Sequence, residues 1–470
     1  MKSASSFAVL VSIFFFWGFV AASNDILIPV FKEQLNLKQW QSQMISFAFY
    51  VAYTVGSILY ILLSKLFKGD LLNRLGYKNG VALGLLISAM GTLLFIPAAS
   101  QASFSIMICG LFTVGLGFSL QQTAANPLAI NLGEKSKGSQ RLSLAGAVNN
   151  IGTTIGPLLI SYAIFGSILG EGKSLNSLDA IKTPYLILGA AFLIAAIFFK
   201  FSSLPNVIND DNKADLGIVK NKSVLSFPQL SLGMIAIFLY VGVEVSTASN
   251  LPEYLKTNLQ ISTNEIAPFV SLFWASLMIG RWTGAVSAFT PGKSLTSILR
   301  FIMPYLAFGL FLFVNSLANY KVDQFYVYGI IILVLIFCDI ISKGFPTRQL
   351  FLFSLMGILA LFIGIFSGGI VGAYAFMSVG LFCSTLWPCI FTIAIAGLGN
   401  KTNQGSSYLI MMIMGGGFVS LFQGFLADES LLGIKWSYLV GVICFCYLAF
   451  YGYYSNILLK KQGIDLEATK

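Results

Sequence analysis

Fourteen apolar segments, most of them long enough to cross a bilayer as a helix, constrain the fold of this chain more than any other feature. Apolar residues make up 57% of the sequence and charged residues only 10%. A helix needs about 20 apolar residues to span the hydrocarbon core, where backbone polar groups must bond internally. We therefore predict an all-α membrane protein with fourteen transmembrane helices. The segments lie at about 6–31, 41–64, 78–99, 103–132, 142–169, 183–204, 229–252, 266–290, 298–318, 325–342, 349–367, 369–396, 405–427 and 436–459.

Positive charge is distributed unevenly between the two sides that this count predicts. With the N-terminus in the cytoplasm, 21 of the 28 Lys and Arg residues lie on the cytoplasmic side and seven lie outside. Cytoplasmic loops of membrane proteins carry such an excess. We predict a multi-pass protein of the plasma (inner) membrane with both termini cytoplasmic. The net charge of +10 then reflects loops facing anionic lipid, not nucleic acid. The first segment is too long for a signal-peptide core and is expected to be retained.

One long polar stretch divides the chain near its middle. Residues 205–224 are rich in Asn, Asp and Lys and lack apolar periodicity. This pattern predicts an N-terminal six-helix half at 1–204, a cytoplasmic linker at 205–227 and a C-terminal half at 228–470.

A weak internal repeat supports the division into two halves. Pro127 and Pro388 lie in corresponding segments, and each is followed about 25 residues later by glycines, from Gly152 and Gly415. Proline interrupts the backbone hydrogen bonds of a helix, and glycine lets two helices approach closely. Both features suit helices that rock around a central cavity, although ordinary membrane packing uses the same residues.

Two acids lie inside apolar segments. Asp25 is the only ionisable side chain from Ser3 to Phe31, and Glu244 lies about 15 residues into its own segment. A carboxylate at membrane depth costs roughly 2.5–3.5 kcal/mol unless a cavity, a polar partner or a bound cation offsets it. Asp25 could instead lie among the outer headgroups. Glu244 could pair with Arg281, which we expect near the cytoplasmic end of its segment. We take both acids as candidates for cation coupling.

Amide side chains gather in the fourth and fifth segments. Carboxamides both donate and accept hydrogen bonds, which suits the hydroxyl groups of a sugar. The alternative is interhelical bonding, worth roughly 0.6 kcal/mol per contact. Asn149 and Asn150 point to adjacent helix faces, so we expect one to reach the cavity and the other to join helices. The predicted substrate-binding residues are Asp25, Gln121, Gln122, Asn126, Asn149, Asn150, Glu244, Asn250 and, as a stacking platform, Trp387.

Seven short motifs occur in order along both halves of the chain: NDILIP from Asn24, QTAANP from Gln122, RLSLAGAVNNIG from Arg141, KTPYLI from Lys182, YVGVE from Tyr240, GRWTG from Gly280 and QGSSYLIMMIMGGG from Gln404. As a set they resemble the fucose–galactose–glucose:cation symporter family of the major facilitators. The segment GDLLNRLGYKNG from Gly69 resembles the loop that controls helix gating in that superfamily. The resemblance implies the major facilitator fold of two six-helix halves. It also implies a secondary active sugar symporter, not an enzyme, that works by alternating access without a cofactor.

The details of the motifs resemble the glucose/galactose members more than the L-fucose:proton member. In the latter, an aspartate and a glutamate carry proton coupling and sugar contact, and these positions fall at Asp25 and Gln122. A tryptophan of that member falls at Ala248. The resemblance implies import of glucose or galactose, coupled to sodium or protons, with sodium slightly favoured. An L-fucose or N-acetylglucosamine proton symporter, a non-transporting sugar receptor and a multidrug exporter are the alternatives.

Two segments, at about 298–318 and 325–342, exceed what this family needs. We predict an inserted transmembrane hairpin at about 292–345, between the eighth and ninth core helices and outside the sugar path. Asp339, close to Lys343 at the cytoplasmic end, is expected to be solvated. The chain contains no histidine, and its six cysteines show no metal-ligand spacing, so no metal site is expected. The expected partners are a hexose and membrane lipid, and the protein is expected to be a monomer.

Overall fold

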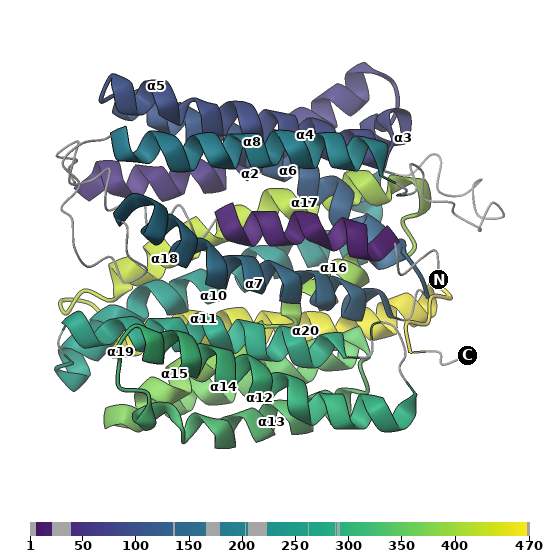
Figure 1. The fold of residues 1–470 in the computed structure, drawn as a ribbon. Coiled ribbons are helices and arrows are strands. Elements are labelled where there is room, and N and C mark those ends of the chain that lie inside the picture. Colours follow the sequence, from purple (N-terminus) through teal and green to yellow (C-terminus); the bar gives the residue numbers. More distant parts are fainter. Residues whose placement is uncertain are drawn as a thin grey trace. The chain divides into compact units, whose positions relative to one another are not determined.

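The computed structural model describes residues 6–20, 39–134, 137–165, 179–202, 204, 223–261, 263–286, 288 and 292–467. Within these ranges the chain is helical and contains no strand (Figure 1). Each of the fourteen predicted segments contains a helix. Eleven helices of the described ranges are long and apolar enough to cross a membrane. The prediction of an all-α membrane fold is therefore confirmed, whereas the linker at 205–227 lies largely outside the described residues.

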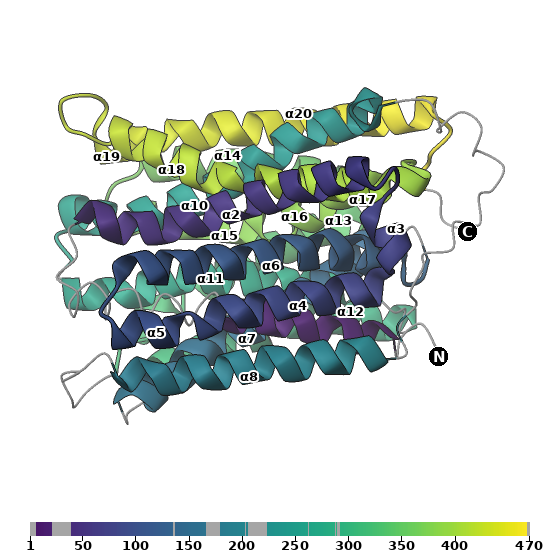
Figure 2. The ribbon, with the colours of Figure 1, turned by 90° about the horizontal axis from the view of Figure 1, so that it is seen from above.

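Contacts divide the chain into two compact units. Unit 1 comprises Met1–Leu132, Val148–Val219 and Gly399–Met411. Its helices are residues 6–20, α2 (Gln39–Leu66), α3 (Leu71–Leu75), α4 (Tyr77–Leu93), α5 (Phe95–Ser100), α6 (Phe104–Asn131), α8 (Asp179–Phe201), α17 (Thr402–Met411) and most of α7 (Gly138–Phe165). In this unit α6 lies between α2 and α4, and α4 packs against α8 (Figure 2). Helix α17 packs against α2 and α6.

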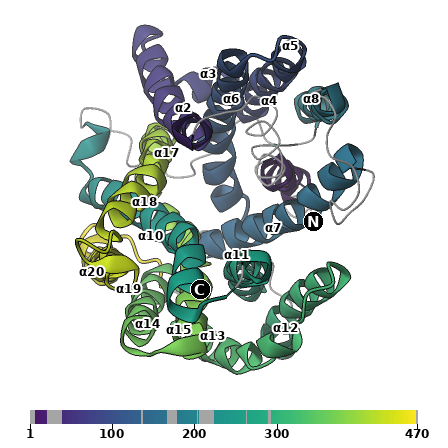
Figure 3. The same cartoon turned by 90° about the vertical axis from the view of Figure 1, so that its left-hand side faces the viewer.

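Unit 2 comprises Gly133–Ala147, Lys220–Leu398 and Met412–Lys470. Its helices are α10 (Pro228–Leu259), α11 (Thr263–Ala285), α12 (Lys293–Leu317), α13 (Tyr328–Ser342), α14 (Pro346–Phe366), α15 (Gly369–Cys383), α16 (Leu386–Ile395), α18 (Gly415–Leu426), α19 (Gly433–Ser437), α20 (Leu439–Lys461) and the first turns of α7. Helix α10 contacts α15, α16, α18 and α20. The predicted hairpin forms α12 and α13 at the edge of this unit (Figure 3).

The glycines of the repeat lie where two helices meet. A Cβ added at Gly152 would lie 2.2 Å from the carbonyl oxygen of Phe15, and one at Gly415 would lie 2.0 Å from that of Phe238. Both distances are shorter than any real contact, so only glycine permits these helix pairs. The expected close approach of helices at these two positions is confirmed.

Pro127 frees a carbonyl that another helix then uses. Proline has no N–H, so the carbonyl of Thr123, four residues earlier in α6, lacks its usual helical donor. The Ser406 hydroxyl on α17 donates to this oxygen at 3.1 Å. A local feature of the sequence thus creates a hydrogen bond between two helices of unit 1.

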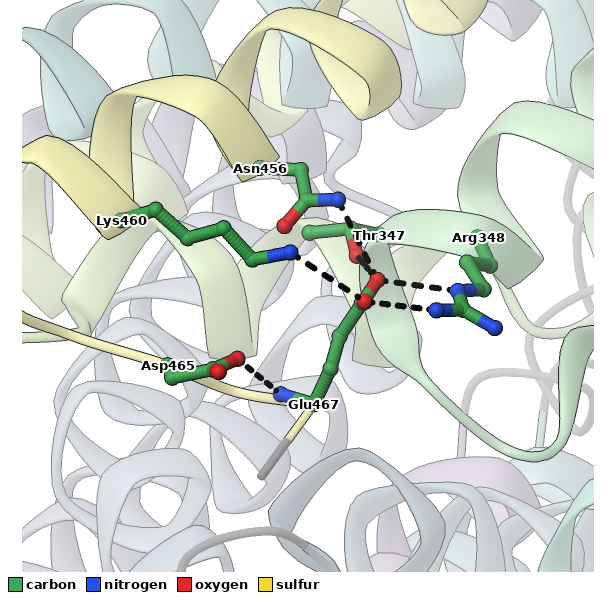
Figure 4. Close-up of polar contacts among 6 residues, drawn as sticks. All are labelled: Thr347, Arg348, Asn456, Lys460, Asp465 and Glu467. Atoms are coloured by element: carbon green, nitrogen blue, oxygen red, sulfur yellow. Dashed lines mark hydrogen bonds and ion pairs between the residues drawn. The ribbon is translucent and has the colours of Figure 1, made fainter. Parts of the chain in front are cut away.

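After α20 the chain returns to α14 of unit 2, where Glu467 makes several polar contacts (Figure 4). The Glu467 carboxylate accepts from Arg348 Nε at 3.1 Å, Arg348 Nη2 at 2.8 Å and the Thr347 hydroxyl at 3.1 Å. Asn456 Nδ2 donates to it at 3.2 Å, and Lys460 Nζ lies 3.5 Å away. Burial alone would raise the pKa of Glu467, but the bonds from Arg348 and Thr347 and the nearby positive charges lower it below its usual value. These contacts of Glu467 join α14 to the end of α20.

Glu467→Gln is expected to destabilise unit 2 at neutral pH by about 1–2 kcal/mol, because charge-assisted hydrogen bonds are lost at a partly exposed site. Folding lowers the pKa of Glu467, so its carboxylate stabilises the folded state fully at pH values above its pKa in the unfolded state. This stabilisation is lost as the pH falls through the pKa of Glu467 in the folded state. The difference in unfolding free energy between wild type and variant should therefore vanish in acid. Glu429→Gln, at an exposed loop position, is the control. An equal difference at acid and neutral pH would contradict this role.

Candidate functional site

Asp25, the first predicted site residue, lies outside the described residues. The remaining predicted residues fall into a group in unit 1 and a group in unit 2.

Gln122 and Asn126 lie one turn apart on α6. Gln122 is partly exposed, and its Nε2 donates to the Tyr53 hydroxyl at 3.1 Å. Asn126 is buried, and its Nδ2 has no hydrogen-bond partner among the described residues. A buried amide without a partner costs roughly 1–3 kcal/mol, which a ligand hydroxyl could recover. This pair therefore remains a candidate for contact with hydroxyl groups.

Gln121 and Asn149 use their amides to join helices. Gln121 is fully buried, accepts from Trp17 Nε1 at 2.7 Å and donates to the Ser88 hydroxyl at 2.9 Å. Asn149 Nδ2 donates to the carbonyl of Phe14 at 2.8 Å. These contacts connect α6 and α7 with the helix of residues 6–20, whereas the predicted contact of both residues with substrate stays a prediction. Asn150, the neighbour of Asn149, is buried.

Glu244 lies in a polar cluster of unit 2. The Tyr240 hydroxyl, one turn earlier on α10, donates to Glu244 Oε2 in a short hydrogen bond. Arg281 on α11 lies near enough for its charge to act on the carboxylate. The Tyr240 and Trp387 rings are 6.3 Å apart, and Trp387 is partly exposed. Tyr240 thus contacts a carboxylate and lies near a partly exposed indole, two kinds of group that suit a sugar ring.

Pro388 explains how Arg281 is held. The missing N–H of Pro388 leaves the Ser384 carbonyl without its helical donor, and α15 ends at Cys383 before α16 begins at Leu386. Arg281 Nε donates to this carbonyl at 3.3 Å. The proline of the second half thus provides an interhelical acceptor, as Pro127 does in the first.

Asn250 lies six residues after Glu244 on α10. It is buried, and its Nδ2 donates to the carbonyl of Ser246 at 2.8 Å, within its own helix. The Ser246 and Thr247 hydroxyls are buried without partners in the described part of the chain. Tyr240 is the residue here that sequence reasoning missed. Its spacing of four residues from Glu244, on one helix face, is the signal that could have identified it.

The loop signature from Gly69 forms a polar cluster with α17 in unit 1. Asp70 accepts from the Tyr60 hydroxyl and from Asn403 Nδ2, both at 2.9 Å. Asn403 Nδ2 also lies 3.0 Å from Asn73 Oδ1, and the Tyr77 hydroxyl donates to Asn403 Oδ1 at 2.5 Å. The signature residues therefore meet the helix that begins at Thr402, as expected of a loop that controls helix contacts.

The predicted hairpin is anchored by a buried polar chain. Asp339 is 3% exposed, lies 3.3 Å from Arg300 Nε and accepts from Gln349 Nε2 at 3.2 Å. The Cys389 thiol in turn donates to Gln349 Oε1 at 3.5 Å. The expectation that Asp339 is solvated is wrong, because the folding of α12 and α14 against α13 encloses it.

The side chains on the outer faces of the hairpin are expected to have no part in substrate binding. Phe313 and Phe337 are 60% and 65% exposed. Phe313→Ala and Phe337→Ala should leave the sugar Kd within about twofold of wild type, since such exposed substitutions act weakly. Equilibrium binding of labelled sugar to the purified protein measures this. A loss of affinity above about tenfold in either variant would contradict the peripheral role of the hairpin.

Comparisons with known proteins give matches over most of the chain. The family model of the Major Facilitator Superfamily matches residues 5–338. A glucose/galactose transporter of Brucella abortus is 34% identical, covering 94% of this chain and 92% of the relative. An L-fucose-proton symporter of Escherichia coli is 28% identical, covering 93% and 90%. The crystal structure of the transporter FucP in the outward conformation has a TM-score of 0.73 and 25% identity, covering 97% of this chain and 99% of that one.

Proposed function

This chain belongs to the Major Facilitator Superfamily, and on that premise we propose that it is a secondary active sugar:cation symporter. It imports a hexose such as glucose or galactose by alternating access and is not an enzyme. The observation that carries the proposal is similarity, over nearly the whole chain, to a relative named as a glucose/galactose transporter. The polar groups in both units supply hydrogen-bonding partners of the kind a sugar needs.

The proposed roles differ between residues. Gln122 and Asn126 in unit 1, and Glu244 with Trp387 in unit 2, contact the sugar. Asn150 and Asn250 stay candidates for that contact. Gln121 and Asn149 hold helices together, and Asp25 carries the coupling cation.

The coupling ion is sodium or a proton. Two relatives are named as L-fucose-proton symporters, which favours a proton. Gln122 stands where the L-fucose:proton member has a glutamate, and its side chain cannot titrate, which favours sodium. Uphill uptake into proteoliposomes under a sodium gradient at equal pH, or under a pH gradient without sodium, separates the two. The protein acts as a monomer in the plasma (inner) membrane, with both termini in the cytoplasm.

We expect glucose or galactose to be preferred over L-fucose. A site built to bond a hydroxyl rejects an analogue that lacks it, and L-fucose lacks the 6-hydroxyl. In counterflow, proteoliposomes loaded with unlabelled sugar should take up labelled glucose, and external L-fucose should compete at least about tenfold more weakly than glucose. Liposomes without protein are the control.

Equal competition by L-fucose and glucose would contradict this selectivity. N-Acetylglucosamine belongs in the same panel as a competing substrate. Binding of sugar without any counterflow would instead favour a non-transporting receptor of the same fold.

A further inference from the structure

Tyr53 lies where α2 and α6 of unit 1 pack closely together. A Cβ added at Gly115 of α6 would lie 2.6 Å from Ala52 Cβ. One added at Gly56 of α2 would lie 2.7 Å from Ser119 Cβ. Across the same contact, Ser119 Oγ donates to the Tyr53 carbonyl at 3.1 Å. Because the glycines permit this approach and the serine hydroxyl bridges it, the backbone of Tyr53 is fixed against α6.

The side chain of Tyr53 is held as firmly as its backbone. The ring of Phe49, one turn earlier on α2, lies edge-to-face against it, with centroids 5.3 Å apart. Phe49 in turn packs against Phe118 of α6, with centroids 5.9 Å apart. Tyr53 is only 5% exposed, so neighbouring atoms restrict the rotation of its ring. Its hydroxyl therefore stays beside Gln122, whose Nε2 donates to it at 3.1 Å.

This hydrogen bond fixes the direction of the Gln122 amide. The nitrogen and the oxygen of a carboxamide point to different sides, so Oε1 is turned away from the Tyr53 hydroxyl that binds Nε2. Asn126 lies one turn further along α6, on the same helix face. It is buried, and its Nδ2 has no hydrogen-bond partner in the described part of the chain. Helix α6 thus offers an acceptor and a donor one turn apart.

From these contacts we propose that Tyr53 is a positioning residue, which fixes the amide of Gln122 so that Gln122 Oε1 and Asn126 Nδ2 form an acceptor–donor pair for one hydroxyl group of the hexose. The inference deepens the proposed function and rests on it. A hydroxyl group both donates and accepts, so a single one satisfies both amides. A sugar without this hydroxyl leaves both amides unpaired, which is the basis of strong rejection. Tyr53, being buried, acts through Gln122.

The test compares glucose with the monodeoxyglucoses, each of which lacks one hydroxyl group. Each sugar competes with labelled glucose for the purified protein at equilibrium. Tyr53→Phe keeps the ring and removes the hydroxyl, so the Gln122 amide is free to turn. We expect the affinity for glucose to fall by about threefold to tenfold. The affinity for one monodeoxyglucose should stay within about twofold, because that analogue never used the pair. The other analogues should weaken together with glucose.

Variants of Gln122 test whether Tyr53 acts through this residue. Gln122→Ala should lose the preference for glucose over the same monodeoxyglucose. Adding Tyr53→Phe to Gln122→Ala should change no affinity by more than about twofold, since the group that Tyr53 positions is already absent. Gln122→Glu should keep the preference. Glutamate has the size of glutamine and retains an acceptor in either protonation state, and the Tyr53 hydroxyl can donate to its other oxygen.

Ser119→Ala is the matched control for the contact between α2 and α6. It removes the hydrogen bond to the Tyr53 carbonyl and leaves the Tyr53 hydroxyl in place. Any loss of affinity in this variant should be equal for glucose and for every monodeoxyglucose. The preference for each hydroxyl group should therefore match that of wild type.

Three outcomes would overturn the inference alone. The first is equal weakening of glucose and all monodeoxyglucoses by Tyr53→Phe, which is the behaviour of a structural residue. The second is additive effects of Tyr53→Phe and Gln122→Ala, which would show that Tyr53 does not act through Gln122. The third is loss of the preference in Gln122→Glu, which would show that the amide donates to the sugar. A wild type that binds no hexose would instead overturn the proposed function, and this inference with it.

Discussion

Asp25→Asn is expected to abolish accumulation of sugar against its gradient while counterflow remains measurable. Asparagine has the size of aspartate but can neither bind a proton at neutral pH nor neutralise a cation. Without cation binding the ion gradient no longer acts on the sugar, so the accumulation ratio should fall to about one. Counterflow needs no net ion movement and should persist.

Labelled glucose uptake into proteoliposomes with an imposed ion gradient measures this effect. Asp25→Glu keeps the carboxylate and serves as the matched control, with accumulation retained at least in part. Accumulation by Asp25→Asn equal to that of wild type would place the coupling elsewhere. This result identifies whether Asp25 carries the coupling ion.

Asp339→Ala is expected to cause the largest loss of stability, about 3 kcal/mol or more. The substitution leaves Arg300, whose side chain is only 19% exposed, without its counter-charge, and it removes the acceptor of Gln349 Nε2. Breaking a buried ion pair in this way costs more free energy than the intact pair contributes, because the remaining charge stays desolvated. The free energy of unfolding in mixed detergent micelles provides the measurement.

A double-mutant cycle tests the physical reason. Asp339→Ala combined with Arg300→Met should destabilise the protein less than the sum of the two single substitutions, since no charge is left unpaired. Asp323→Asn, at an exposed position at the other end of the same hairpin, should change stability by less than about 0.5 kcal/mol. Strict additivity of the two single effects would show that the ion pair does not hold the hairpin.

Much of the fold follows from the sequence. Hydropathy and length located each helix-containing segment, and the family resemblance carried by the motifs is confirmed. Local backbone chemistry was equally predictable. Pro127 and Pro388 free the carbonyls of Thr123 and Ser384 wherever the helices lie, because proline never has an N–H to donate.

Tertiary structure alone decided which polar side chains remain available at the candidate site. Gln121 and Gln122 are chemically identical neighbours, yet Gln121 is enclosed by Trp17 and Ser88 while Gln122 is partly exposed. Consecutive residues of a helix point about 100° apart, and the rotation of the helix against its neighbours determines which one meets a partner.

The packing of separate helices also determines which partners the charged residues have. Depth in the membrane follows from hydropathy, so the sequence could show that Glu244 lies within a span. The partner of a charge depends on how separate helices cross. Tertiary packing therefore enclosed Asp339 between Arg300 and Gln349, and it placed Arg281 on the Ser384 carbonyl.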